Sequence, residues 1–344
     1  MQTNINEIAR RCGVSIATVS RVFNNKGPIK ESTRQKVLQV ARELNYHPNY
    51  TARGLSRRKT DTIGVILPEL NDEFFMNIIH GIDEVANRNK QYLLVSSSHS
   101  RRNDVETMLD FMGSGRVDGI ILLAPGICES VIELKTKSRY PLVLLNCGKG
   151  IKDIVSFGVD NYRGAYLMTE HLIGHGYRKI AIVKGPEQNT EAIDRFQGFS
   201  DAMRDNRLGL KDALVVSGDF SFKSGYYGFL RLMGNKEQPE AIFFSNDMMA
   251  LGAYDAARSS GINIPGDVAI TGFDDIFSGR IIDPRLTTVN IPIMELGSKA
   301  AEYLLKMIKG EVDPRQPYKE VLSTALIIGG SCGCSNGTTS KIIA

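Results

Sequence analysis

The sequence predicts a small all-α helix-turn-helix domain followed by an α/β core of two doubly wound parallel-sheet lobes. Two short amphipathic runs joined by a glycine open the chain, and from residue 61 onward apolar strands alternate with amphipathic helices. All of the basic excess lies in the first 60 residues. With 344 residues, of which 42% are hydrophobic and 23% charged, the chain has the length and composition of a globular protein with a sizeable core.

The helix-turn-helix is predicted from residues 4 to 25. The run INEIARRC has its apolar residues at the spacing i, i+3, i+4 and i+7, which is one face of a helix, and Asn4 and Glu7 are placed to cap its start. Gly13 allows a tight turn, because glycine readily adopts a positive φ. Ser15 can then cap a second helix whose Val19 and Val22 face inward.

The outer face of this second helix gathers Ile16, Ala17, Ser20 and Arg21 at its N-terminal half, from which a helix-turn-helix reads base edges in the major groove. A helical hairpin packed on another domain would show the same pattern, so the distribution of charge is needed to distinguish the two. Residues 1 to 60 contain 12 Lys or Arg and three acidic residues, a net charge of +9, whereas residues 61 to 344 have a net charge of −5. Such an asymmetry favours a nucleic-acid-binding module over a solvated basic face.

A third helix is expected from Glu31 to Leu44, and Pro48 ends the first domain, at residues 1 to 48. Residues 49 to 60 are basic, contain Gly54 and are too short to form a stable helix alone in water. They are predicted to be a hinge that folds on contact with a partner.

Nine apolar strands are expected in the core, in two series separated by amphipathic helices. They are residues 62–68, 92–98, 119–125, 141–146 and 155–160, then 179–185, 213–219, 241–247 and 268–274. Fully apolar strands that alternate with helices indicate parallel sheets covered on both faces. Polar side chains cluster just after these strands, where open parallel sheets bind ligands, and predict a cleft between two lobes.

No apolar run of about 18 residues and no apolar signal segment is present, so we expect a cytoplasmic protein without membrane contact. The five scattered cysteines argue against a disulfide framework. Cys332 and Cys334 form a C-x-C, but the sequence shows no second cysteine or histidine pair to complete a zinc site. No metal and no cofactor is therefore predicted.

Five passages carry a resemblance that covers nearly the whole chain. They are INEIARRCGVSIATVSRVFN, LNYHPNYTARGL, FGVDNYRGAY, FFSNDMMALGAY, and ITGFDD followed by PRLTTVNIP. Together they resemble the LacI/GalR family of bacterial transcription regulators. The resemblance implies a periplasmic-binding-protein-like core at residues 61–331, in which the chain crosses three times between the lobes. The N-terminal lobe would be about 61–160 and 292–320, the C-terminal lobe about 161–291 and 321–331, and residues 332–344 a tail without a packing pattern.

The resemblance also implies partners: a pseudopalindromic double-stranded DNA operator, a second copy of the chain in a homodimer, and a small effector that controls operator affinity. The implied DNA-binding residues are Ser15, Ile16, Ala17, Thr18, Ser20, Arg21, Asn49, Ala52 and Leu55. Leu55 occupies the place of a leucine that wedges into the minor groove and kinks the duplex. Ile16 and Ala17 are small and apolar, so they offer methyl contacts to bases.

The implied effector-binding residues are Phe74, Phe75, Asp160, Asn189, Glu191, Arg195, Phe220, Asn246 and Asp274. Aromatic faces can stack on a sugar ring, while arginine and carboxylates hold neighbouring hydroxyls. Purine-binding members of the family have an arginine and a threonine where this chain has Asn189 and Glu191. A carbohydrate or a derivative of one is therefore favoured over a purine.

Two other functions can be weighed against this one. A sugar-binding protein of an uptake system would share the core, but it would need an export signal and no helix-turn-helix. An enzyme would need a catalytic motif. The sequence has no phosphate loop, no G-x-S-x-G, no H-E-x-x-H and no G-x-G-x-x-G after the first strand, and its five histidines form no recognisable pair with a nucleophile.

Overall fold

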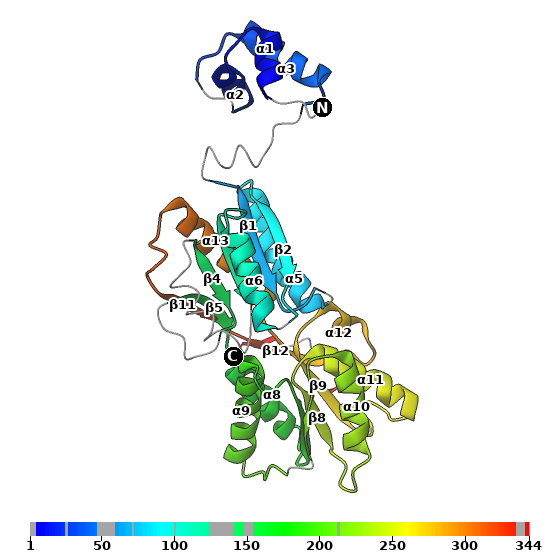
Figure 1. The fold of residues 1–344 in the computed structure, drawn as a ribbon. Helices are drawn as coiled ribbons and strands as arrows, with labels where there is room; N and C mark the ends of the chain where they lie inside the picture. Colours follow the sequence, from blue (N-terminus) through cyan, green and yellow to red (C-terminus); the bar gives the residue numbers. More distant parts are fainter. Residues whose placement is uncertain are drawn as a thin grey trace. The chain divides into compact units, whose positions relative to one another are not determined.

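The computed structural model describes residues 5–24, 27–46, 59–70, 72–99, 101–123, 140–147, 154–211, 214–334 and 341–343. The chain divides into two compact units, Met1–Thr60 and Asp61–Ala344, and each is described by itself (Figure 1). Among the described residues, no helix is long and apolar enough to cross a membrane. Asn4, Asn49, Ala52 and Leu55 lie outside the described residues.

The first unit contains three short helices around one small core. They are α1 (Ile5–Cys12), α2 (Ile16–Asn24) and α3 (Glu31–Glu43). Ile8, Val19 and Val37, one from each helix, are fully buried in the same cluster. Gly13 joins α1 to α2 with a φ of 68°, a conformation that glycine adopts without strain.

The second unit begins with a six-stranded parallel sheet of order β11-β5-β4-β3-β1-β2. Its strands are β1 (Thr62–Leu67), β2 (Tyr92–Ser97), β3 (Gly119–Leu123), β4 (Leu142–Leu145), β5 (Val155–Val159) and β11 (Tyr318–Leu322). Successive side chains of a strand point to opposite faces of the sheet, so neighbouring residues pack in different hydrophobic clusters. Val65 packs in the cluster that includes α5 (Glu73–Arg88) and α13 (Ile293–Lys309), and Ile66 in the cluster that includes α6 (Arg102–Gly113).

The other sheet has seven strands in the order β13-β12-β10-β9-β8-β6-β7, with β12 and β13 antiparallel to their neighbours. The strands are β6 (Ile180–Lys184), β7 (Val215–Ser217), β8 (Ala241–Phe244), β9 (Ala269–Asp274), β10 (Thr287–Asn290), β12 (Ala325–Ile327) and β13 (Lys341–Ile343). The helices are α8 (Asn161–Gly174), α9 (Thr190–Asp205), α10 (Phe222–Met233), α11 (Asp247–Ser260) and α12 (Phe277–Ile281). Both faces of the sheet are covered by helices, as expected for buried parallel strands.

The chain passes between the two sheets at three places: from β5 to α8, from β10 to α13, and from β11 to β12. All three connections are short, and the polypeptide therefore joins the two lobes three times. This arrangement places the carboxyl ends of β1, β6, β8 and β9 around one cavity.

The segment after residue 331 differs from the unpacked tail that the sequence predicts. Cys332 is fully buried, and Lys341–Ile343 forms strand β13 on β12. The Tyr177 hydroxyl donates a hydrogen bond to the backbone oxygen of Cys332, at 3.1 Å. The expectation was wrong because this segment is held by backbone pairing and two cysteines, which leave no hydrophobic periodicity to detect.

The cysteines also depart from expectation. Cys147, just after β4, is disulfide-bonded, whereas Cys12, Cys332 and Cys334 are free. Spacing along the chain could not reveal this, because the fold decides which loops approach one another.

Candidate functional site

The first unit presents the N-terminal half of α2 as an exposed surface. Ser15, Ile16, Ala17 and Arg21 are exposed, and Ile16 retains 48% of its accessible surface. Thr18 and Ser20 are half-buried on the same helix. The Ser15 hydroxyl accepts a hydrogen bond from the backbone N–H of Thr18, at 3.2 Å, and so caps the helix as predicted.

Glu7 pairs with two arginines on α1, whereas Asn4, its expected partner at the start of the helix, lies outside the described residues. The Glu7 carboxylate lies 2.8 Å from Nη2 of Arg10 and 2.9 Å from Nε of Arg11. These hydrogen bonds lower the pKa of Glu7 to about 2. The interaction follows from helical spacing, because residues three and four apart share one face of α1.

A cavity of about 610 Å³ lies in the second unit, at the carboxyl ends of strands from both sheets. Its walls are Pro68, Glu69, Asp72, Phe74, Phe75, Leu123, Pro186, Asn189, Glu191, Arg195, Asp219, Phe220, Ser221, Phe222, Lys223, Asn246, Met248 and Asp274. Eight of the nine effector residues named from the sequence are among these. The cavity has the size of a small-ligand site and combines aromatic with charged walls.

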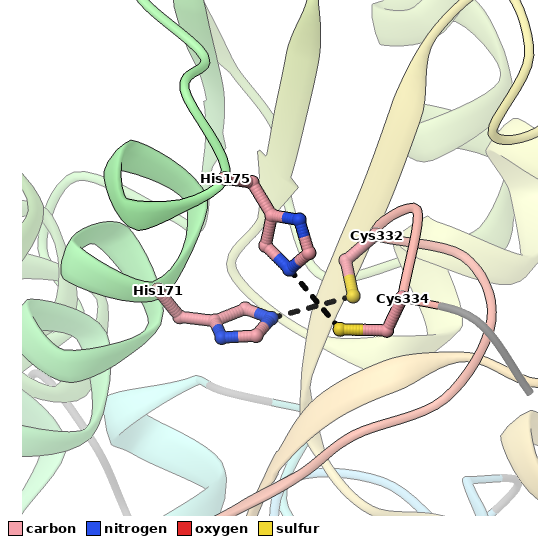
Figure 2. Close-up of side chains that lie close together, drawn as sticks. All are labelled: His171, His175, Cys332 and Cys334. Atoms are coloured by element: carbon pink, nitrogen blue, oxygen red, sulfur yellow. Dashed lines mark hydrogen bonds between the residues drawn. The ribbon is translucent and has the colours of Figure 1, made fainter. Parts of the chain in front are cut away.

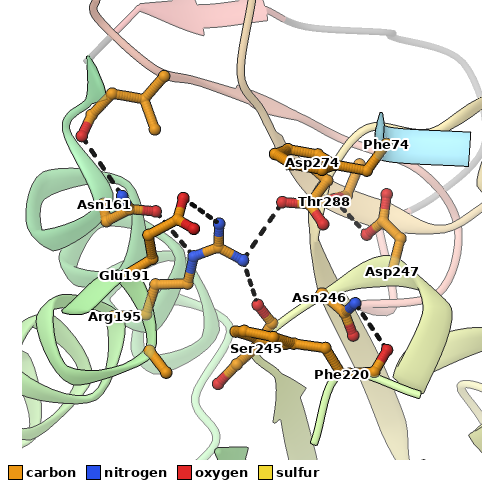
Figure 3. A network of polar contacts seen from close by, with 12 residues as sticks. Phe74, Asn161, Glu191, Arg195, Phe220, Ser245, Asn246, Asp247, Asp274 and Thr288 are labelled. Carbon is orange, nitrogen blue, oxygen red and sulfur yellow. Dashed lines mark hydrogen bonds and ion pairs between the residues drawn. The ribbon is translucent and has the colours of Figure 1, made fainter. Parts of the chain in front are cut away.

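Arg195 of α9 lies at the centre of a buried polar network (Figure 3). Its side chain is only 3% exposed, and its Nε donates to Oδ1 of Asn161 at 2.8 Å. Nη1 donates to the backbone oxygen of Ser245 at 2.5 Å and lies 3.2 Å from Oδ1 of Asp274. Nη2 lies 3.9 Å from Oε1 of Glu191, so one cation serves two buried carboxylates.

Both of these carboxylates are incompletely satisfied. Among the described residues, Oε1 of Glu191 and Oδ1 of Asp274 are buried without a hydrogen-bond donor, although each lies near Arg195. Burial raises the pKa of Glu191 and that of Asp274, and the nearby arginine opposes this rise only in part. Asp274 also has a φ of 115°, which is strained for a residue with a side chain. Buried acceptors at the wall of a cavity are suited to a ligand that brings hydroxyl donors.

Asp160 does not line this cavity, in contrast to its predicted role. Its carboxylate caps α8 by accepting from the backbone N–H of Arg163, at 3.0 Å, and it lines a second cavity of about 400 Å³ near Asn146 and Lys319. An aspartate after a strand can be only a helix cap, and here the direction of α8 keeps the side chain out of the main cavity.

Asp72 and Asp219 follow strands β1 and β7 and line the cavity, as predicted for polar residues just after strand ends, although neither was among the nine effector residues. Phe222 and Lys223 also line the cavity and were not named from the sequence. Phe222 and Lys223 open α10, and no feature of the sequence distinguishes them from ordinary surface residues.

Two family models match this chain, one in each of its two units. One for bacterial regulatory proteins of the lacI family matches residues 4–49, and one for a periplasmic binding protein-like domain matches residues 169–332. Catabolite control protein A of Priestia megaterium is 34% identical over 312 residues, which cover 90% of this chain and 94% of that protein. The chain belongs to the LacI family of bacterial regulatory proteins.

Solved structures of LacI-family regulators share the fold over the same length. A lac repressor dimer bound to operator and an anti-inducer matches with a TM-score of 0.85 and 26% identity, covering 96% of this chain and 99% of that one. A complex of the transcriptional regulator CelR with cellobiose matches with a TM-score of 0.73 and 27% identity, with the same coverage.

The two lobes of this LacI-family protein contact each other through Glu73 of α5, which lies between the cavity residues Asp72 and Phe74 in the chain. The Glu73 carboxylate accepts from the Ser278 hydroxyl at 2.8 Å and from the Ser278 backbone N–H at 3.3 Å, and also from the backbone N–H of Phe277. Glu73 belongs to the lobe of sheet β11-β5-β4-β3-β1-β2 and Ser278 to the other. This contact therefore holds the lobes together in the observed arrangement.

We expect Glu73→Ala to weaken closure of the lobes by about 1–2 kcal/mol, because it removes charge-assisted hydrogen bonds at a half-exposed site. An effector that binds the closed cavity would lose roughly 5–30-fold in affinity. Titration calorimetry with a sugar that binds the wild type measures the loss of affinity. Glu84→Ala changes an exposed position on the same helix and should bind the sugar as tightly as the wild type does. Equal affinities for all three proteins would show that the contact of Glu73 with Ser278 does not stabilise the closed lobes.

Asp247 lies beside the site, fully buried at the start of α11. It accepts from the Thr288 hydroxyl at 2.6 Å and from the backbone N–H of Ile276 at 3.0 Å (Figure 3). Burial raises its pKa from 3.8 to about 7. Asp247 thus fixes the segment between Asp274, at the end of β9, and the start of α12.

This shift makes stability depend on pH. Between pH 4 and pH 7 the folded state holds a proton on Asp247 that the unfolded state has lost, so stability falls as pH rises, by up to about 4 kcal/mol from this group. Asp247→Asn should remove this contribution, so that the free energy of unfolding depends less on pH. Urea unfolding at several pH values would measure the difference. Asp255→Asn, on the exposed side of α11, should leave the slope unchanged. If the free energy of unfolding depended on pH equally in Asp247→Asn and in the wild type, the raised pKa would not belong to Asp247.

Proposed function

We propose that the protein is a transcription repressor whose operator affinity is set by a small carbohydrate bound in the 610 Å³ cavity. The observation that carries this proposal is the buried group of Arg195, Glu191 and Asp274 beside aromatic walls. It supplies both donors and acceptors to a polar ligand while the rings cover an apolar face.

A sugar has the chemistry that these walls need. Its hydroxyls can donate to the buried oxygens of Glu191 and Asp274 and accept from Arg195, which satisfies acceptors that have no hydrogen-bond donor within the described part of the chain. The rings of Phe74 and Phe75, packed edge to face at 5.2 Å between centroids, and that of Phe220 can cover the C–H face of a sugar ring. CelR, a structural relative, is described in complex with cellobiose, which supports this class of ligand.

For DNA we propose that the exposed face of α2 enters the major groove, with Ser15, Ile16, Ala17, Ser20 and Arg21 toward the bases and Thr18 toward a phosphate. We propose minor-groove contacts for Asn49, Ala52 and Leu55 in the hinge. One short helix buries too little surface to specify a site alone, so two copies of the chain would bind a pseudopalindromic operator together. The related lac repressor is described as a dimer bound to operator.

We further propose that the protein acts in the cytoplasm, where its operator is, and that it has no catalytic role. Its relatives are regulators, and the polar groups of the cavity are arranged to hold hydroxyls.

A thermal-shift screen of the full chain against glucose, ribose, cellobiose and their phosphates tests the proposal. A ligand present at 100 times its dissociation constant adds about 2.7 kcal/mol of stability, which is a readily measured rise in melting temperature. We expect at least one sugar to raise the melting temperature of the wild type and not that of Asp274→Asn. A shift of equal size in both proteins would place the sugar elsewhere, and a shift with purine bases but with no sugar would overturn the carbohydrate assignment.

A further inference from the structure

Two histidines and two cysteines meet in the second unit (Figure 2). None of the four lines the effector cavity. His171 and His175 belong to the last turns of α8 and its C-cap, and Cys332 and Cys334 follow β12. The four ligand atoms all lie within 4.8 Å of one another. Nε2 of His171 is 3.3 Å from Sγ of Cys332, and Nε2 of His175 is 3.0 Å from Sγ of Cys334.

The spacing in each pair suits a shared metal ion. Residues i and i+4 of a helix lie one above the other on one face, so His171 and His175 point the same way. Figure 2 shows both imidazoles directed at the two sulfurs, which come from one tight segment. Zinc bonds are about 2.0–2.1 Å to nitrogen and 2.3 Å to sulfur, so the ligand atoms of a tetrahedral site lie roughly 3.5–3.8 Å apart. The observed separations need only small side-chain movements to match this geometry.

The surrounding residues hold the cysteines in place. Cys332 is fully buried, its Sγ accepts from the Thr287 hydroxyl at 3.1 Å, and its backbone oxygen accepts from Tyr177 at 3.1 Å. Such partners around the first ligands orient a metal site. His175 is exposed and Cys334 is half-buried, which leaves a path for an ion to enter.

We propose that His171, His175, Cys332 and Cys334 bind one zinc ion, which anchors the C-terminal segment to α8. Two nitrogens and two thiolates in a tetrahedral arrangement form a closed structural site, with no position open for catalysis. The sequence alone does not predict this zinc site, because no histidine pair lies near the C-x-C and 161 positions separate His171 from Cys332 in the chain. The fold brings the two pairs together.

The anchored helix gives the site a structural consequence. α8 begins at Asn161, the residue that accepts from Arg195 at the effector cavity, and ends at the proposed metal. Zinc would therefore fix the far end of a helix whose near end belongs to the effector network. Its loss should loosen the C-terminal segment first, since Cys332 and Cys334 contact His171 and His175 at the end of α8.

The direct test is the metal content of the full chain, purified in a reducing agent that does not bind metals and dialysed against zinc. We expect one zinc per chain by elemental analysis, and visible absorption typical of tetrahedral thiolate coordination when cobalt replaces it. His175→Gln and Cys334→Ser change the two most exposed ligands and so have the best prospect of folding. Each should lower zinc affinity at least about 100-fold, measured with a competing chelator.

His80→Gln, an exposed histidine on α5, is the matched control and should keep one zinc per chain. Removing zinc with a chelator should lower the melting temperature of the wild type and of His80→Gln, but not that of Cys334→Ser. A reduced wild type that takes up no zinc from micromolar solution would overturn the proposal. So would retention of tightly bound zinc by the folded double variant of His175 and Cys334.

Discussion

Arg195→Ala should lower the free energy of unfolding by about 3–5 kcal/mol near pH 7.5, because it leaves two buried carboxylates without their shared cation. Asp274 lies 3.2 Å from the guanidinium, and Glu191 lies 3.9 Å from it. Burial already raises the pKa of both acids, and removal of Arg195 should raise them further. The variant's carboxyls then stay protonated to a higher pH in the folded state. Its stability should therefore fall more steeply as pH rises, and the difference from the wild type should shrink toward pH 5.

Urea unfolding at pH 5 and pH 7.5 measures both parts of this prediction. Arg204→Ala is the matched control, since Arg204 is on the same helix with 68% of its side chain exposed and pairs with Asp201 at the surface. It should change stability by less than about 1 kcal/mol at either pH. An Arg195→Ala protein as stable as the control at pH 7.5 would show that the two acids do not depend on Arg195.

Deletion of residues 1–60 should abolish operator binding and low-salt retention on DNA or heparin. That segment carries a net charge of +9, and the remainder carries −5. Specific sites are typically bound 10³–10⁷-fold more tightly than other DNA, and both contributions should disappear with the first unit, since phosphate contacts supply most of the non-specific affinity.

The remaining unit has its own sheets and cores, so its melting transition and its response to sugar should persist. Arg21→Ala in the full chain is the graded comparison. It should cost about 1–3 kcal/mol of operator affinity while low-salt retention survives. DNA retention by the truncated protein would contradict the assignment of DNA binding to the first unit.

The fold class followed from the sequence because its signals are local and repeated. The central parallel strands are apolar runs, as in the TIGVIL of β1 and the AIFF of β8, and they alternate with helices. The edge strand β11 has no such signature. β11 reads YKEVL, with mostly exposed residues, and only its pairing with β5 identifies it as a strand.

The site residues that follow strand ends or belong to family motifs could be predicted from the sequence. Eight of the nine named effector residues lie around one cavity, and the exception, Asp160, is turned away by the helix that it caps. The contacts between side chains could not be predicted. Glu73 meets Ser278 across the lobes, and His171 meets Cys332 over a sequence separation of 161, because long-range packing determines both. Such pairs leave no periodic trace in a single sequence.

The central claim is that a sugar in the cavity sets the affinity of the protein for its operator. The most direct measurement is the fluorescence anisotropy of a labelled operator, selected from random DNA by the protein itself, with and without a sugar that raises the melting temperature. Coupling between two such sites is typically 1–3 kcal/mol, so the saturating sugar should change the operator dissociation constant of the wild type by about 5–150-fold. The same sugar should change it less than about twofold for Asp274→Asn, whose DNA affinity without sugar should equal that of the wild type. A sugar that saturates the wild-type cavity and leaves operator affinity unchanged would contradict the account.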